Sequence, residues 1–185
     1  MARQAPGAIA VDPIGKVLYR ASAALAVLGG FLLAAIMVMV VVSIIGRNMA
    51  GVPLFGWLGP VPGDFELVEL GVAIALFSFL PYCQIVRGNV AVDFFVARAS
   101  ARARAWFAVA GNLLYTIIAA LLAWQLFNGY LDRLGPYGET TWILGLPTKW
   151  GYLCAFVATV LLTLVCAYTV LRSIAEARGD GEPAR

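Results

Sequence analysis

Four long, predominantly apolar segments constrain the fold of this chain more than any other feature of its sequence. In chain order they cover about residues 19–46, 66–86, 105–131 and 150–172. The first has no charged side chain from Ala21 to Gly46, a stretch that spans about 39 Å as a helix. Because the hydrocarbon core of a bilayer is about 30 Å thick and barrel strands alternate over only about ten residues, these runs predict helices that cross a membrane. The sequence therefore predicts an all-α membrane protein with four transmembrane helices.

The composition agrees with a membrane location. Of the 185 residues, 62% are hydrophobic and 12% are charged, whereas soluble domains carry about 25% charged residues. Little chain is left outside the four segments, so we expect one membrane domain over residues 1–185. Basic residues before the uncharged run that begins at Ala21, such as Lys16 and Arg20, are also typical of a signal peptide. The apolar core of a signal peptide is about 7–15 residues long, so we interpret the longer segment here as a retained span.

Several classes of active site are excluded by the residues that the chain lacks. It contains no histidine, which removes Ser-His-Asp triads, histidine-ligated zinc and haem held by two histidines. Its three cysteines, Cys83, Cys154 and Cys166, are widely spaced in apolar segments and are best explained as packing residues. There is no basic run interleaved with aromatic residues. We therefore expect no enzyme activity, no metal, no cofactor and no nucleic-acid partner.

The distribution of basic residues predicts the orientation. Ten lysine and arginine residues lie in the two terminal segments and in the link at residues 87–104, and three lie on the opposite side, namely Arg47, Arg133 and Lys149. The positive-inside rule then places both termini in the cytoplasm. The opposite side is acidic, with Asp64, Glu66, Glu69, Asp132 and Glu139.

The link before the third span has an amphipathic pattern. Asp93 is suited to cap a helix, Arg98 and Arg102 lie four residues apart on one helical face, and Arg104 follows closely. This pattern predicts an amphipathic helix over residues 91–104 that lies on the cytoplasmic membrane surface, with the three arginines facing anionic lipid. The alternative is a solvated helical extension of the third span.

Three acidic residues lie at the start of the second span. Asp64 is suited to be the N-cap of this helix, and Glu66 and Glu69 in its first turns favour the positive end of the helix dipole. A functional interpretation instead pairs Glu66 and Glu69 with Arg47, at the end of the first span, or with a basic residue of a partner. Both interpretations stay open on the sequence alone.

Four further positions are candidates for a structural role or for contact with a partner: Asn89, Asp93, Pro147 and Trp150. Asn89 follows Gly88 as in a turn, and the functional alternative for Asn89 and Asp93 is a contact with a partner. Pro147 suits the start of the fourth span, and Trp150 is a residue type that anchors helices at the membrane surface.

The centres of the spans carry no Asp, Glu, Lys or Arg. Transport sites and proton relays usually need such a group, so we expect no solute site within this chain. Uncharged polar residues in the spans indicate hydrogen bonds between helices: Ser43, Ser78, Gln84, Asn112, Thr116, Gln125, Thr159 and Thr163. Small residues indicate close helix approach at Gly29, Gly30, Gly71 and Gly111.

The second span and its flanks resemble a known family. The runs that carry the resemblance are Pro62-Gly63-Asp64-Phe65-Glu66-Leu67-Val68-Glu69, Phe79-Leu80-Pro81-Tyr82-Cys83-Gln84 and Arg87-Gly88-Asn89-Val90-Ala91-Val92-Asp93-Phe94, with Arg47 and Leu146-Pro147-Thr148-Lys149-Trp150 as further matches. The chain resembles the small membrane subunit of tripartite ATP-independent periplasmic (TRAP) transporters of bacteria and archaea. The family commonly has histidine where Asn89 stands, and asparagine cannot take up a proton near neutral pH.

The resemblance implies a role within a complex in the bacterial inner membrane. It implies a scaffold that braces a large membrane subunit of about a dozen spans, which holds the solute and sodium sites, while a periplasmic substrate-binding protein delivers an organic acid. Two other functions remain as alternatives. One is a self-sufficient small four-helix carrier or channel, which the uncharged span centres disfavour. The other is a membrane enzyme or redox subunit, which the lack of histidine disfavours.

Overall fold

The computed structural model describes residues 13–49, 59–86, 88, 101–135 and 139–178, and these are almost entirely helical. The helices are α1 (Pro13–Met49), α2 (Asp64–Ile85), α4 (Ala101–Asp132) and α5 (Lys149–Arg178). Each is long and apolar enough to cross a membrane. The prediction of an all-α membrane protein with four spans is confirmed.

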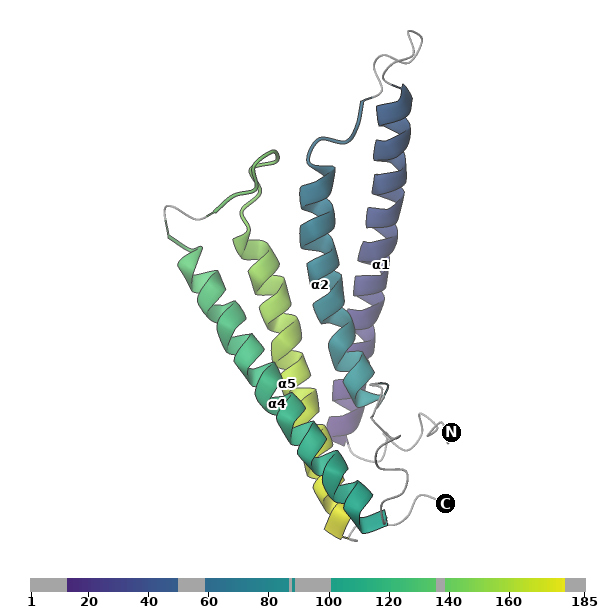
Figure 1. The fold of residues 1–185 in the computed structure, drawn as a ribbon, viewed down its shortest axis with the longest axis vertical. Coiled ribbons are helices and arrows are strands. Elements are labelled where there is room, and N and C mark those ends of the chain that lie inside the picture. Colours follow the sequence, from purple (N-terminus) through teal and green to yellow (C-terminus); the bar gives the residue numbers. More distant parts are fainter. Residues whose placement is uncertain (1–12, 50–58, 87, 89–100, 136–138, 179–185) are drawn as a thin grey trace.

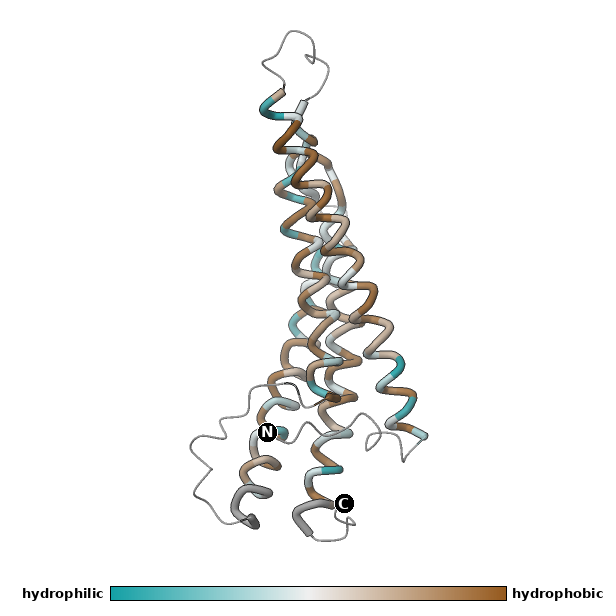
Figure 2. The backbone as a smooth tube through the Cα atoms, turned by 90° about the vertical axis from the view of Figure 1, so that its right-hand side faces the viewer, coloured by the Kyte–Doolittle hydropathy of each residue, from teal (hydrophilic) through white to brown (hydrophobic). Residues whose placement is uncertain are grey.

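The helices lie in a row in the order α1, α2, α5, α4 (Figure 1). Helix α2 packs against both α1 and α5, and α4 packs mainly against α5. Seen from the side, the helices largely overlap, so the protein is a thin layer (Figure 2). The α1–α2 pair and the α4–α5 pair diverge toward one end of the layer. We call it the loop end, because residues 59–63 and 139–148 lie there, and we call the other end the terminal end.

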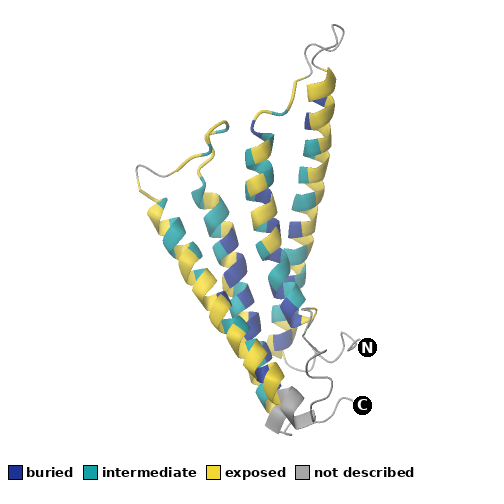
Figure 3. Ribbon diagram, in the orientation of Figure 1, coloured by how far each residue is buried: buried dark blue, intermediate teal, exposed yellow. Residues whose placement is uncertain are grey.

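Burial is concentrated in the two central helices (Figure 3). In the most apolar stretch of each helix, 39% of the residues of α5 and 33% of those of α2 are buried, against 11% for α4 and 6% for α1. The core where α2, α4 and α5 meet contains Ala119, Leu162 and Cys166, with Leu80 and Tyr115 packed against it. The two outer helices therefore present most of their apolar surface outward, which is stable only in an apolar environment.

Glycine allows close approach between α1 and α2 at two positions. A Cβ atom added to Gly29 would lie 3.0 Å from the Cβ of Ser78 and 3.3 Å from the carbonyl oxygen of Ala75, and one added to Gly71 would overlap Ile36. Close packing at Gly29 and Gly71 is thus as predicted. Gly30 and Gly111 have open space around them in the described chain, so close approach at these two positions stays a prediction for contact with a partner.

The helices extend beyond the predicted spans. Helix α1 begins at Pro13 instead of residue 19, and α5 ends at Arg178 instead of residue 172. The length of an apolar run is set by the thickness of the membrane, whereas the helix itself continues into flanking polar residues, such as Lys16 in α1 and Ser173 in α5.

The amphipathic link falls mostly outside the described residues. Asn89, Asp93 and Arg98 lie there, so the surface helix remains a prediction for residues 91–100. Arg102 and Arg104 belong to the first turn of α4, which continues directly into the third span. For these two residues the backbone agrees with the alternative of a helical extension.

The close contact at Gly29 predicts the effect of adding a side chain there. We expect Gly29→Leu to destabilise the protein by about 1–3 kcal/mol, because the leucine must displace α2. Gly30→Leu is the matched control, one residue away and facing open space, and should change stability by less than about 0.5 kcal/mol. The measurement is the unfolding midpoint in detergent micelles. Equal midpoints for the two variants would contradict the close packing.

Candidate functional site

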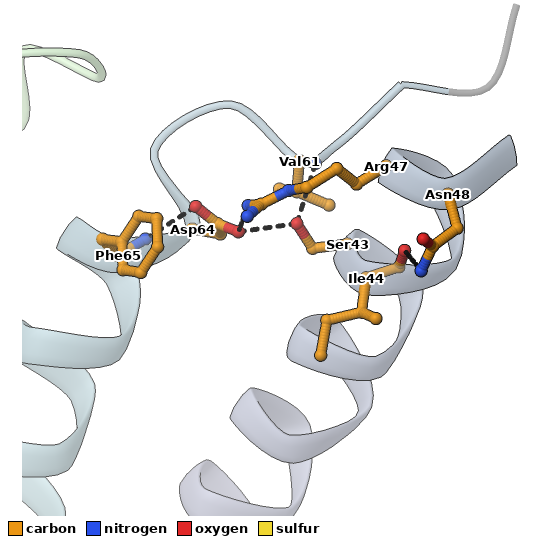
Figure 4. Close-up of polar contacts among 7 residues, drawn as sticks. All are labelled: Ser43, Ile44, Arg47, Asn48, Val61, Asp64 and Phe65. Atoms are coloured by element: carbon orange, nitrogen blue, oxygen red, sulfur yellow. Dashed lines mark hydrogen bonds and ion pairs between the residues drawn. The ribbon is translucent and has the colours of Figure 1, made fainter. Parts of the chain in front are cut away.

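A polar cluster joins the ends of α1 and α2 at the loop end (Figure 4). The hydroxyl of the fully buried Ser43 donates a hydrogen bond of 2.6 Å to Asp64 Oδ2 and accepts one of 3.2 Å from the backbone N–H of Val61. Arg47 Nη2 lies 3.2 Å from the same carboxylate oxygen. The other oxygen, Oδ1, accepts the backbone N–H of Phe65 at 2.9 Å. One carboxylate thus holds α1, the start of α2 and the loop between them.

Two glycines allow the chain to enter this cluster. Gly46 lies so close to the backbone of Gly59 that no side chain fits between them. Gly63 is the N-cap residue of α2, with φ of 72°, a conformation that side chains disfavour. The N-cap position predicted for Asp64 is therefore occupied by Gly63, and Asp64 is the first helical residue.

The partner of Arg47 differs from that in one of the two interpretations of the sequence. Arg47 pairs with Asp64 and not with Glu66 or Glu69, and it lies 5.9 Å from the centre of the Phe65 ring. The Arg47 side chain is 55% exposed and that of Asp64 is 16% exposed. An exposed ion pair contributes at most about 1 kcal/mol, whereas a hydrogen bond to a charged group contributes about 1.5–3 kcal/mol. The bond from buried Ser43 therefore stabilises the cluster more than Arg47 does.

Glu66 has a role that the sequence interpretation missed. Its two carboxylate oxygens accept the backbone N–H groups of Ile143 at 2.7 Å and of Leu144 at 3.1 Å. These two residues belong to the loop that leads into α5, so Glu66 ties α2 to a segment almost eighty residues away. The residue types near position 143 do not predict this contact, because its donors are backbone N–H groups.

The loop that Glu66 holds is itself ordered by hydrogen bonds. The backbone of Thr141 and Leu146 pairs at 2.9 Å, and both the N–H and the hydroxyl of Thr148 donate to the carbonyl of Glu139. Pro147 lies in this loop, two residues before the first residue of α5, and its carbonyl accepts the N–H of Trp150.

The aromatic side chain of Trp150 lies at the loop end of α5. It is 59% exposed, and the ammonium of Lys149 lies 6.0 Å from its ring. An exposed tryptophan beside a cation at a helix end is suited to the membrane surface.

Arg133 stabilises the α4–α5 pair at the same end. Its guanidinium donates to Glu139 Oε2 at 2.8 Å and to the carbonyl of Gly129 at 3.1 Å, and it lies 4.1 Å from the centre of the Tyr152 ring. Stacking a guanidinium on an aromatic ring adds a cation–π interaction to the ion pair. The sequence interpretation used Arg133 only to count charge.

Glu69 differs from its acidic neighbours. It is exposed, and within the described part of the chain it forms no hydrogen bond or ion pair. It lies five residues after the start of α2, about 7.5 Å along the helix axis from Asp64. The helix dipole favours it there, but no contact within the described chain neutralises its charge.

A second polar cluster lies between α2, α4 and α5, near the terminal end. The side-chain amide of Gln84, which is 4% exposed, donates to Thr169 Oγ1 at 3.0 Å and to Asn112 Oδ1 at 3.3 Å. Asn112 in turn donates to Ser173 Oγ at 2.9 Å. These groups are neutral, and all but the partly buried Asn112 are buried, so they hold three helices together as the sequence predicts for Gln84 and Asn112.

None of this polar chemistry resembles a catalytic or metal site. Among the described residues, no three His, Cys, Asp or Glu side chains lie close enough to hold a metal ion. The clusters consist of hydrogen bonds and ion pairs that connect helices and loops.

Comparison with known proteins identifies one family. Residues 36–176 match the family model described as the DctQ component of tripartite ATP-independent periplasmic transporters. The match covers more than half of the chain and includes both polar clusters. Searches of curated proteins and of solved structures gave no match.

The contact of Glu66 with the loop at residues 139–148 can be tested by hydrogen exchange. We expect Glu66→Ala to accelerate amide exchange in this loop about tenfold or more, because two N–H groups lose a charged acceptor. Glu69→Ala, one turn further along α2, is the control and should leave exchange in the loop unchanged. The measurement is exchange of the purified protein followed by mass spectrometry of the peptide at residues 139–148. Unchanged exchange in Glu66→Ala would contradict the contact.

Proposed function

Because the chain belongs to the DctQ component family of the TRAP transporters, we propose that it is the scaffold that braces the large membrane subunit of such a transporter. In this role it holds no solute site of its own. It contributes a wide apolar layer that keeps the stationary part of the large subunit fixed in the membrane while the solute-carrying part moves.

The observation that carries this proposal is the thin layer of four helices with uncharged centres. Among the described helices, α2 and α5 are packed on two sides by other helices, whereas α1 and α4 are covered mainly on one side. From Leu70 to Ile85 in α2 and from Trp150 to Leu171 in α5, there is no ionisable acid or base of the Asp, Glu, Lys or Arg type. A brace needs such apolar faces, whereas a carrier needs a polar site inside the membrane.

We further propose the reaction that the complex performs. A periplasmic substrate-binding protein delivers an organic acid to the large subunit, and the gradient of an ion, with sodium as the expected coupling ion, drives uptake without ATP. The support for these features is the resemblance to the family, and no side chain of this subunit is used to argue for them. The complex is placed in the bacterial inner membrane.

The proposed orientation has both termini in the cytoplasm. The loop end, with the clusters around Asp64 and Glu66, then faces the periplasm, where the binding protein approaches. The basic residues Arg98, Arg102 and Arg104 lie on the cytoplasmic side, where anionic lipid attracts them. The excess of basic residues on the side of the termini supports this orientation.

A self-sufficient four-helix carrier or channel is the alternative. Its strongest candidate for a polar path is the cluster around Gln84, but those side chains satisfy one another between packed helices. Because the amides and hydroxyls of this cluster bond to one another, they are not open to a passing solute. This arrangement favours the scaffold.

Reconstitution distinguishes the two functions. Liposomes that contain this chain and the large subunit should take up the organic acid when binding protein and an inward sodium gradient are supplied. Liposomes with this chain alone should show uptake no greater than empty liposomes, because its spans hold no ionisable site. Uptake by the chain alone would overturn the scaffold function. Full uptake by the large subunit without this chain would overturn it as well.

A further inference from the structure

We propose that one exposed face of α2 docks a transmembrane helix of the large subunit, and that this partner helix carries an arginine or lysine opposite Glu69. The face consists of Phe65, Glu69, Val72 and Leu76, and we call it the α2 stripe. The inference rests on the proposed function, since it names the place where that partner binds.

The spacing of the α2 stripe puts its members on one side of the helix. They lie at positions separated by four, three and four residues, the repeat that aligns side chains along a helix. Phe65 is 72% exposed, Val72 41% and Leu76 58%. The face of α2 that packs against α1 is a different one and contains Gly71, Ala75 and Ser78.

The negative charge of Glu69 determines which kind of partner can bind to the α2 stripe. Asp64, Glu66 and Glu139 each have a donor within the chain, whereas Glu69 has none in the described part and is flanked by apolar side chains. A carboxylate that is flanked by apolar side chains near the membrane surface is stabilised when a cation pairs with it. Side chains of a helix tilt toward its N-terminus, so the carboxylate points toward the loop end. The complementary cation therefore lies near the loop end of the partner helix.

Another face of α2 is apolar and carries no charge. A groove of about 380 Å³ between α1, α2 and the start of α5 is lined there by apolar residues, among them Leu67, Leu70 and Ile74. Lipid acyl chains satisfy such a surface without any specific contact. They cannot satisfy a carboxylate. The charge on the α2 stripe thus selects a protein helix, whereas the groove requires only lipid.

The location of the interface is tested by site-specific crosslinking in the purified complex. A photo-reactive phenylalanine analogue is placed at position 76 on the α2 stripe or, as the matched control, at position 74 in the groove. We expect crosslinks to the large subunit from position 76 and only background from position 74. No crosslink from position 76, or equal crosslinks from both, would overturn the proposal.

The charge is tested by reversal at two positions on the same side of the membrane. Glu69→Lys should lower the amount of large subunit that co-purifies with this chain about tenfold or more, because two cations then face each other. Asp132→Lys is the control, with the same charge change at an exposed residue that ends α4. It should leave co-purification unchanged.

The outcomes separate this inference from the function on which it rests. Co-purification of Glu69→Lys at the wild-type ratio would overturn the α2 stripe and leave the scaffold function intact. Failure of the wild-type chain to co-purify with a large subunit would overturn the scaffold function itself.

Discussion

The contact between α2 and α5 is the interaction on which the rest of the structure depends. Without it the protein would be two separate helical hairpins, since α1 packs mainly on α2 and α4 mainly on α5. The contact is fixed at both ends. The bond from Gln84 to Thr169 joins the helices near the terminal end, and Glu66 holds the loop before α5 where the two hairpins diverge (Figure 1). Hydrogen bonds therefore join the two hairpins near each end of the α2–α5 contact.

A layer of this kind is stable only because its surroundings are apolar. In water, the outward faces of α1 and α4 would expose a row of large side chains, such as Phe31, Met37, Leu114 and Trp124. In a bilayer the same faces cost nothing, and they remain available to a partner. Within a membrane, the hydrophobic effect gives helices no reason to associate, so contacts that use charge or close packing decide where a partner binds. In α2 the close packing at Gly71, Ala75 and Ser78 joins α2 to α1, so we propose that the charge of Glu69 directs the partner.

The spans were predictable from the sequence because membrane thickness imposes a length on apolar segments, and all four are confirmed. The side-chain contacts at the loop end could not be predicted in the same way. Proximity in sequence does not determine which carboxylate binds a given arginine. Arg47 bonds Asp64 because the close approach of Gly46 to Gly59 brings the start of α2 beside the end of α1. The contact of Glu66 with the loop before α5 was not predicted, because its donors are backbone N–H groups. The family motifs, by contrast, identified the function class correctly, while Asn89, Asp93 and Arg98 lie outside the described residues.

The most direct test of the scaffold function is to isolate this chain from its native membrane in a mild detergent and to identify by mass what comes with it. We predict one large polytopic membrane protein in equimolar amount, held by apolar contact along the helix layer and by the charge on α2. Isolation of the chain alone, or as an assembly of its own copies, would contradict the scaffold function.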